Sequence, residues 1–387
     1  MNAFTQRASV FSSRPKIIKI GGSCLSSIED IKRIADILIG RISDNEKLVI
    51  VVSAMKGDTD RLLELANSIS PNVSKEDLDQ ILSIGERLSS RLLTAELKSK
   101  GISTRLIDPD NAVIITDNIH GDANPIIEFT KEKVNDKLVP LLQNGTTIVT
   151  GGFFGKSTSG KTTTLGRGGS DSTAVLLGDC LNAEEIVLLK DVDGLLTSDP
   201  KKNKNSKLIK KITAEEAFIL SCSGAKIIQP KSLKLKPANV PIKVVGNGSI
   251  GTVIEGSLKL INHDERPVAL LTVLTSNIEA VHGIKNLTMV RDDKSATLII
   301  SQEDVSKAID ELNQLIEKGK AKAFTVKENL GLVSIKSSSD TIPKIVNSLE
   351  QSGIQIENII STPSTINILI KFFNTDRTVQ LLKEVIR

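Results

Sequence analysis

The chain has 387 residues, enough for two or three domains, and 39% of them are hydrophobic, so a sizeable core can form. It contains nine Phe and no Trp or Tyr, and this scarcity of aromatics argues against single-stranded nucleic-acid binding, which depends on stacking. The net charge of +4 is small for this length. Six lysines lie between Lys201 and Lys211 without interleaved aromatics, and we interpret them as a solvated surface.

Strands and helices alternate through the first two thirds of the chain. The predicted strands are 16–20, 48–52, 103–107, 146–150, 185–189 and 242–245. The predicted helices are 27–42, one that begins at Asp60, 75–100, 124–143, 170–181 and 213–222. This order predicts an α/β domain with a parallel sheet, which we assign to residues 16–265.

Past Arg266 the pattern changes to short strands and helices with few glycines. The last stretch is predicted to run strand, helix, strand, strand, helix over 332–336, 343–351, 356–361, 365–372 and 378–385. This βαββα order is typical of a small ferredoxin-like module, which we place at residues 330–387. A weaker half-copy, a strand at 296–301 and a helix at 303–318, indicates a degenerate module at 266–329.

Cysteine and histidine usage limits the available chemistry. Cys24, Cys180 and Cys222 have neither paired nor metal-ligand spacing, which favours a reducing cytoplasm. The three histidines are isolated, so no catalytic or metal-binding histidine arrangement is predicted. No apolar run reaches membrane-spanning length. Residues 1–15 carry Ser and Arg without acids, a composition also found in transit peptides, and we interpret them as a disordered extension.

The first chemical motif is Lys19-Ile-Gly21-Gly22-Ser23, in which two glycines close a strand ahead of a helix. Glycine allows backbone N–H groups to approach a phosphate, and the helix start adds partial positive charge. Lys19 can place its ammonium at the β- and γ-phosphates of a nucleotide. By itself the motif is equally compatible with an ordinary turn.

A P-loop pattern also occurs, because Gly155–Thr162 reads GKSTSGKT after a strand. A P-loop needs a helix that begins at its Lys-Thr pair, and the β-branched, glycine-rich residues 162–169 do not favour one. The next strand end carries Lys190 where a Walker B segment would supply its acid. We therefore interpret the match as a coincidence.

The segment Thr163–Asp171, TTLGRGGSD, runs into a predicted helix with Ser170 as N-cap and Asp171 in the first turn. Its three glycines leave the backbone open to a ligand. Arg167 offers a planar fork for a carboxylate or phosphate, and an arginine among glycines has little structural reason. These features indicate an active-site loop.

Two further motifs admit two interpretations each. Ser83–Ser89, SIGERLS, places Gly85 inside a long helix at a cost of about 1 kcal/mol relative to alanine. Beside it, Glu86 is either a ligand for a substrate ammonium or a surface glutamate. Lys190–Gly194, KDVDG, is either part of a nucleotide site or a plain acidic turn.

In combination and order, these motifs resemble those of the aspartate kinases, a branch of the amino-acid kinase family. The resemblance spans nearly the whole catalytic domain. Acetylglutamate, glutamate and uridylate kinases share the fold but not Ser83–Ser89 together with Thr163–Asp171. Further matching segments are Ser53-Ala-Met55, Thr59-Asp60, Asp191–Gly194 and Gly224-Ala-Lys226.

The resemblance implies an α/β fold, an amino-acid-kinase-type three-layer αβα sandwich with a C-terminal α+β ferredoxin-like (ACT) region. It implies a transferase that uses ATP and Mg²⁺ to convert L-aspartate to 4-phospho-L-aspartate, towards lysine, threonine and methionine. It further implies a cytoplasmic homodimer or higher homo-oligomer formed through the ACT region, without nucleic-acid or membrane partners. A related kinase with another acidic substrate and a catalytically inactive amino-acid sensor remain as alternatives.

The resemblance also implies residue roles. Lys19, Asp171 and Lys226 would be catalytic, with Asp171 positioning two lysines that stabilise charge on the transferring phosphoryl group. The substrate would be bound by Ser53, Thr59, Glu86, Arg167 and Ser170, with Arg167 on its carboxylate and Glu86 on its ammonium. The nucleotide and its phosphates would be bound by Lys19, Gly21, Gly22, Ser23, Lys190, Asp191, Asp199, Lys201 and Lys226. Mg²⁺ would be held through the ATP phosphates, without a protein metal site.

Three departures from the family pattern stand out. Leu196 replaces a usual tyrosine in the nucleotide loop, so an aromatic contact is missing. Ser337–Pro343 lacks the Pro-Gly helix start that is associated with effector binding. A strand at 287–290 is expected to pass through Arg291–Lys294 directly into the next strand, with loss of the first module's opening helix. The last two departures argue against lysine or threonine feedback.

Overall fold

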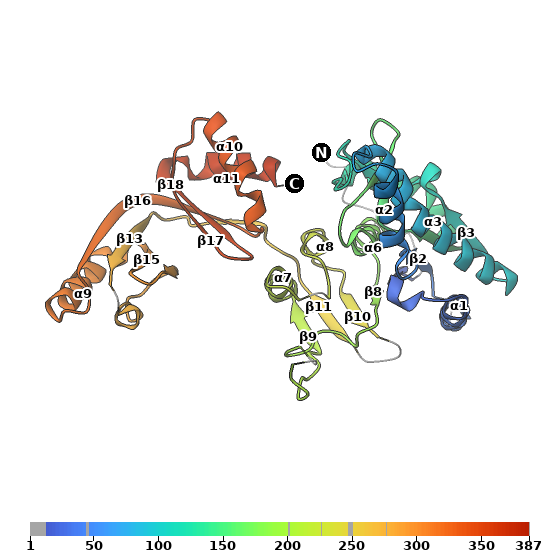
Figure 1. The fold of residues 1–387 in the computed structure, drawn as a ribbon, viewed down its shortest axis with the longest axis horizontal. Coiled ribbons are helices and arrows are strands. Elements are labelled where there is room, and N and C mark those ends of the chain that lie inside the picture. The colour runs from blue at the N-terminus through green and yellow to red at the C-terminus, as the bar shows by residue number, and fades with distance from the viewer. Residues whose placement is uncertain are drawn as a thin grey trace. The chain divides into compact units, whose positions relative to one another are not determined.

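The computed structural model describes residues 13–43, 46–199, 202–225, 227–246, 251–275 and 277–386. The chain divides between Leu258 and Lys259 into two compact units, each described by itself below (Figure 1). Of the extension predicted at 1–15, residues 1–12 lie outside the described residues. None of the helices in the described ranges is long and apolar enough to cross a membrane.

The first unit is built on an eight-stranded sheet of order β3-β5-β2-β1-β8-β10-β11-β9. The strands are β1 (Lys16–Ile20), β2 (Leu48–Val52), β3 (Thr104–Ile107), β5 (Thr147–Gly151), β8 (Ile186–Leu189), β9 (Lys211–Thr213), β10 (Ile242–Val245) and β11 (Thr252–Glu255). The six strands from β3 to β10 pair in parallel. Their carboxyl ends therefore share one edge, where α/β sheets bind ligands.

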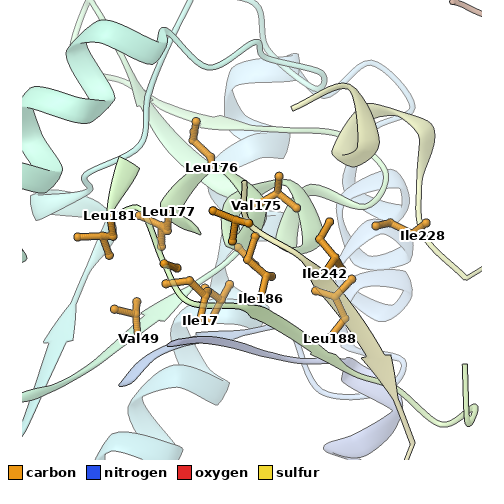
Figure 2. Close-up of a cluster of buried hydrophobic side chains, with 14 of the residues drawn as sticks. Ile17, Val49, Val175, Leu176, Leu177, Leu181, Ile186, Leu188, Ile228 and Ile242 are labelled. Atoms are coloured by element: carbon orange, nitrogen blue, oxygen red, sulfur yellow. The ribbon is translucent and has the colours of Figure 1, made fainter. Parts of the chain in front are cut away.

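Helices cover both faces of this sheet. They are α1 (Ile28–Ser43), α2 (Asp58–Ile69), α3 (Lys75–Ser99), α4 (Ile127–Lys137), α5 (Val139–Gln143), α6 (Gly169–Cys180), α7 (Ala214–Cys222) and α8 (Pro230–Lys234). All of β2 is buried because Val49 and Val51 point into one core and Ile50 into the other. Figure 2 shows the first core, where α6 packs on β1, β2 and β8. The predicted three-layer αβα sandwich is confirmed.

The P-loop-like segment forms a β-hairpin. Strands β6 (Phe154–Ser157) and β7 (Thr162–Thr164) pair antiparallel, and β4 (Ile115–Thr116) joins β6 to complete a three-stranded sheet. Gly160 adopts a positive φ of 83° in the turn. No helix begins at the Lys-Thr pair, so the interpretation of this match as a coincidence is confirmed.

Two local predictions are wrong. The helix predicted over 124–143 is two helices, α4 and α5, with Pro140 in the first turn of the second, where its missing N–H costs nothing.

Ser170 is not the N-cap of α6. Gly168 takes that position with φ 72°, a left-handed conformation that glycine adopts readily, and Ser170 lies buried in the first helical turn.

The second unit is one seven-stranded sheet of order β14-β15-β13-β16-β18-β17, with β12 also paired to β16. Its strands are β12 (Ile261–His263), β13 (Val268–Leu274), β14 (Thr288–Arg291), β15 (Ser295–Ser301), β16 (Ala323–Ile335), β17 (Ile356–Ser361) and β18 (Ile366–Lys371). Its helices are α9 (Val305–Glu317), α10 (Ile342–Gln351) and α11 (Thr375–Val385). The predicted βαββα order is present as β16-α10-β17-β18-α11, as expected for an ACT-like region.

The long strand β16 belongs to both halves of this sheet. Residues 323–327 pair with β13 beside the core under α9, and residues 330–335 pair with β18 beside the core under α10 and α11. Between β13 and β14 the described residues contain only a 3-10 turn, η3 (Ile278–Val281), and β14 turns directly into β15. The predicted loss of the opening helix is confirmed. The module boundaries at 266–329 and 330–387 stay a prediction, and β16 runs through their junction.

Replacing Ile186 by alanine should destabilise the first unit by about 2–5 kcal/mol, because its side chain is fully buried against Gly178 of α6. Ile69→Ala is the matched control, since Ile69 is 87% exposed and should change stability by no more than about 0.5 kcal/mol. Urea unfolding followed by far-UV circular dichroism measures both, because the chain has no Trp or Tyr for fluorescence. Equal stability of the two variants would contradict the packing described above.

Candidate functional site

Most of the sequence-predicted site residues gather at the carboxyl edge of the parallel strands. Lys19 lies at the end of β1, Ser53 directly follows β2 and Lys190 directly follows β8. The strand pairing continues into the loops, since Gly21 N–H donates to Leu189 O at 2.9 Å and Ser53 N–H donates to Ile20 O at 3.1 Å. The loop residues are therefore held in register with the sheet.

A buried carboxylate lies between two lysines at this edge. Lys19 Nζ is 2.8 Å from Asp171 Oδ1, and Lys190 Nζ is 2.8 Å from Asp171 Oδ2. The side chains of Lys19, Asp171 and Lys190 are only 9%, 5% and 15% exposed. We call these three residues the Asp171 centre.

Strand alternation explains how the Asp171 centre forms. Side chains two residues apart point to the same face of a sheet. Lys19 therefore points to the same face as Ile17, and Lys190 to the same face as Ile186 and Leu188. These three apolar side chains belong to the core beneath α6. Asp171 lies in the first turn of α6 and reaches between the two lysines.

The charges of the Asp171 centre support one another. Burial alone would raise the pKa of Asp171, but the ammonium groups of Lys19 and Lys190 outweigh it and hold the pKa below its ordinary value. Burial lowers the pKa of Lys190, against the opposing effect of Asp171. The carboxylate is thus ionised at neutral pH, and the centre carries one net positive charge when both lysines are protonated.

The loop after β1 leaves no room for side chains. A Cβ on Gly22 would lie 2.5 Å from the Ala54 carbonyl oxygen, and one on Gly21 would lie 3.0 Å from that of Leu189. Gly22–Cys24 form a 3-10 turn ahead of α1, with Ser23 inside it. Glycine is therefore required for close packing of this loop, whose backbone is the predicted phosphate contact.

Glu86 of α3 lies buried beside the loop after β2. It is 4% exposed, and burial raises its pKa to about 7 despite a hydrogen bond from the Ala54 backbone. Its Oε2 atom has no hydrogen-bond partner. Gly85 permits this approach of α3, since a Cβ there would lie 2.7 Å from that of Ala54. The interpretation of Glu86 as a surface glutamate is wrong.

Two other predicted substrate residues frame the same loop. Ser53 lies at the end of β2, and its carbonyl oxygen accepts a hydrogen bond of 2.7 Å from Ser89 Oγ of α3. Thr59 lies in the first turn of α2, whose N-cap is Gly57 with φ 85°. Both side chains are half-buried.

In the predicted active-site loop Thr163–Asp171, Arg167 is exposed whereas the first residues of α6 are buried. Arg167 is exposed between Gly166 and Gly168, which both have positive φ, and it pairs with no carboxylate in the described part of the chain. Ser170 packs against Gly152, because a Cβ added to Gly152 would lie only 2.6 Å from the Cα of Ser170. Arg167 is thus free to bind an anion while α6 is fixed to the end of β5.

Two residues that sequence reasoning missed hold this loop. Lys231 of α8 donates to Asp122 Oδ1 at 2.6 Å and to the carbonyl oxygens of Ala123 and Leu165 at 3.0 Å each. Asp79 of α3, 1% exposed, accepts hydrogen bonds from the Gly121 backbone and from the Thr164 hydroxyl. Neither residue could have been found from local pattern, because each lies more than 60 positions from its partner in the loop.

Asp79 also contacts the ring of a histidine. His120 Nδ1 lies 2.8 Å from Asp79 Oδ2. Both residues brace the loop from outside the Asp171 centre.

The predicted nucleotide side is only partly described. Asp191 and Asp199 are exposed, whereas Lys201 and Lys226 lie outside the described residues. In the described ranges no three His, Cys, Asp or Glu side chains gather as a metal site. Mg²⁺ commonly binds through one or two carboxylates together with substrate phosphates, and Asp191 and Asp193 at the end of β8 suit that role.

Comparisons with known proteins identify the family of this chain. The model of the amino acid kinase family matches residues 14–246. An aspartokinase of Corynebacterium glutamicum is 31% identical over 405 residues, covering 95% of this chain and 94% of the relative. An aspartokinase of Mycolicibacterium smegmatis is 29% identical over 404 residues, with the same two coverages.

Solved structures show the same fold. Aspartate kinase from Synechocystis superimposes with a TM-score of 0.75 at 22% identity, covering 96% of this chain and 69% of that one. Escherichia coli aspartokinase III, solved in complex with aspartate and ADP, gives a TM-score of 0.57 at 24% identity, covering 96% and 99%. From the family match and the full-length relatives together, this chain belongs to the amino acid kinase family, in its aspartokinase branch.

Proposed function

We propose that the chain uses ATP to phosphorylate the side-chain carboxylate of L-aspartate, and that the Asp171 centre is the heart of the catalytic site. The observation that carries this proposal is the buried Lys19–Asp171–Lys190 arrangement at the carboxyl edge of the sheet, beside a buried Glu86 with a free oxygen. Lys19 supplies a cation for the transferring phosphoryl group, and Glu86 supplies an anion for the substrate ammonium.

The reaction requires no general base. The side-chain carboxylate of free aspartate has a pKa near ~3.9, so the nucleophile is already ionised at neutral pH. Catalysis then consists of positioning and of neutralising the charge that spreads over the phosphoryl oxygens. Lys19 supplies this charge from β1, and the backbone N–H groups of Gly22 and Ser23 add to it, whereas that of Gly21 already donates to Leu189 O. When bound, Mg²⁺ with the ATP phosphates adds further neutralisation.

Substrate selection follows from two charged side chains. Arg167, exposed and unpaired in the described part of the chain, is suited to the aspartate α-carboxylate. Glu86 Oε2 accepts a hydrogen bond from the α-ammonium of the substrate. This bond gives a partner to a buried oxygen that otherwise lacks one. Ser53, Thr59 and Ser170 complete the pocket, and Lys226 contributes the second phosphate-contacting cation.

The remaining assignments concern the whole enzyme. The proposal includes a homodimer or higher oligomer that forms through the ACT-like unit. It also includes a cytoplasmic location and the use of Mg²⁺. Cys24, Cys180 and Cys222 form no disulfide in the described part of the chain, which supports a reducing compartment. Leu196, at the usual tyrosine position of the nucleotide loop, forms an isolated antiparallel β-bridge with Leu208.

The direct test is a hydroxamate-trapping assay with ATP, Mg²⁺ and a panel of amino acids. Acyl phosphates react with hydroxylamine, so hydroxamate should form with aspartate. Formation with glutamate or an N-blocked acid instead would assign a related kinase activity. No hydroxamate with any acid, from protein that is folded by circular dichroism, would favour an inactive amino-acid sensor.

Arg167→Ala should raise the aspartate KM by about tenfold to a hundredfold, because one charge-assisted interaction with a carboxylate is lost. The KM for ATP should stay close to the wild-type value. Arg105→Ala is the control, since Arg105 is exposed on the edge strand β3 and should leave both constants unchanged. Full aspartate activity in Arg167→Ala would exclude this residue as the carboxylate ligand.

The aspartate KM should depend on pH through Glu86. Only the ionised carboxylate attracts an ammonium, and its pKa is raised to about 7, so protonation competes with substrate at lower pH. The KM should therefore fall by about tenfold between pH 6 and pH 8. In Glu86→Gln the KM should be high and nearly independent of pH over this range, whereas an unchanged pH profile would assign the titration to another group.

A further inference from the structure

Lys190 makes two contacts that the proposed function leaves unexplained. The family resemblance places it among the nucleotide ligands, yet its ammonium lies 2.8 Å from Asp171 Oδ2 and donates to the carbonyl oxygen of Ile227. An ammonium has three N–H donors, and two are already used within the protein. At 15% exposure, this side chain is directed into the fold.

The contact to Asp171 adds a lysine to those expected around this carboxylate. The resemblance gives Asp171 the task of positioning Lys19 and Lys226. The structure pairs its Oδ1 with Lys19 and its Oδ2 with Lys190. Lys190 therefore fixes the rotation of the carboxylate, and with it the direction in which Lys19 is held.

The contact to Ile227 joins a distant segment to the same centre. Ile227 is the residue after Lys226 in the sequence and lies 37 positions beyond Lys190. It follows α7 and Gly224, whose φ is 106°. The backbone of Lys190 is itself anchored, since its N–H donates to Val245 O at 2.9 Å. Its side chain thus ties the backbone at Ile227 to the sheet edge.

Resting on the proposed function, we propose that Lys190 is a positioning residue for phosphoryl transfer. It clamps Asp171 from the side opposite Lys19 and tethers the segment that contains Ile227, and it does not bind the nucleotide. A reaction that depends on orientation loses rate when such a support is removed, even though both substrates still bind.

The split between kcat and KM tests this inference. Lys190→Met keeps the length of the side chain and removes its charge. We expect kcat to fall by about tenfold to a hundredfold, with the KM values for ATP and aspartate within about twofold of wild type. A raised KM for ATP with unchanged kcat would make Lys190 a nucleotide ligand, and unchanged constants would remove its role. Either result overturns the inference. Lys98→Met, an exposed lysine of α3, is the control.

Charge rescue separates positioning from a purely structural role. Lys190→Ala should regain activity in a saturable manner when ethylamine or propylamine is added, because the small ammonium can occupy the vacated place beside Asp171. A folded variant that no amine restores would overturn the inference. If neither Lys190→Met nor Lys190→Ala folds, as judged by circular dichroism, the inference is tested with Lys190→Arg. It keeps the charge, so it should fold and lose kcat without a rise in the KM for ATP.

Amide hydrogen exchange tests the tether without relying on activity. Peptides that contain Ile227 and Ile228 should exchange faster in Lys190→Met than in the wild type or in Lys98→Met. Equal exchange in all three would overturn the tether. Failure of the proposed function looks different: the wild-type protein itself would form no aspartyl hydroxamate, and the exchange experiment would still report on Lys190.

Discussion

The catalytic unit depends on one carboxylate that is held away from water between two ammonium groups. Asp171 is buried, and each of its oxygens has a lysine partner at 2.8 Å. Removing one partner from such a group typically costs about 3–5 kcal/mol, because a buried charge is left uncompensated. The arrangement therefore constrains β1, β8 and the start of α6 at the same time. A site organised in this way is fixed before any substrate arrives.

The surrounding glycines serve the same constraint. Gly22 lies against the Ala54 carbonyl, Gly85 against the Ala54 methyl group and Gly152 against Ser170. Each allows two elements to approach more closely than any side chain would permit. As a result, Glu86 of α3 reaches the loop after β2, and the start of α6 reaches the end of β5. The motifs of this family thus combine chemical groups with the spaces that let those groups meet.

Part of the site could be read from the sequence because its signals are local. Lys19 with its two glycines, the arginine in the TTLGRGGSD loop and a glycine beside Glu86 are departures from ordinary helices and strands within a few residues. The alternation of β8 also carried a signal that was missed: Lys190 shares the inward face of Ile186 and Leu188. Lys231 and Asp79 gave no signal, since their partners come close only after the chain folds.

The sequence by itself determined the order of strands and helices, the three-layer class and the residues that carry charge. Hydrophobic periodicity and turn chemistry act over a few residues and are visible in the printed chain. Only the tertiary structure decided that Lys190 shares Asp171 with Lys19, that burial raises the pKa of Glu86 to about 7 and which distant side chains brace the TTLGRGGSD loop. Those outcomes depend on burial and on contacts between segments far apart in the chain, and neither quantity exists until the sheet has formed.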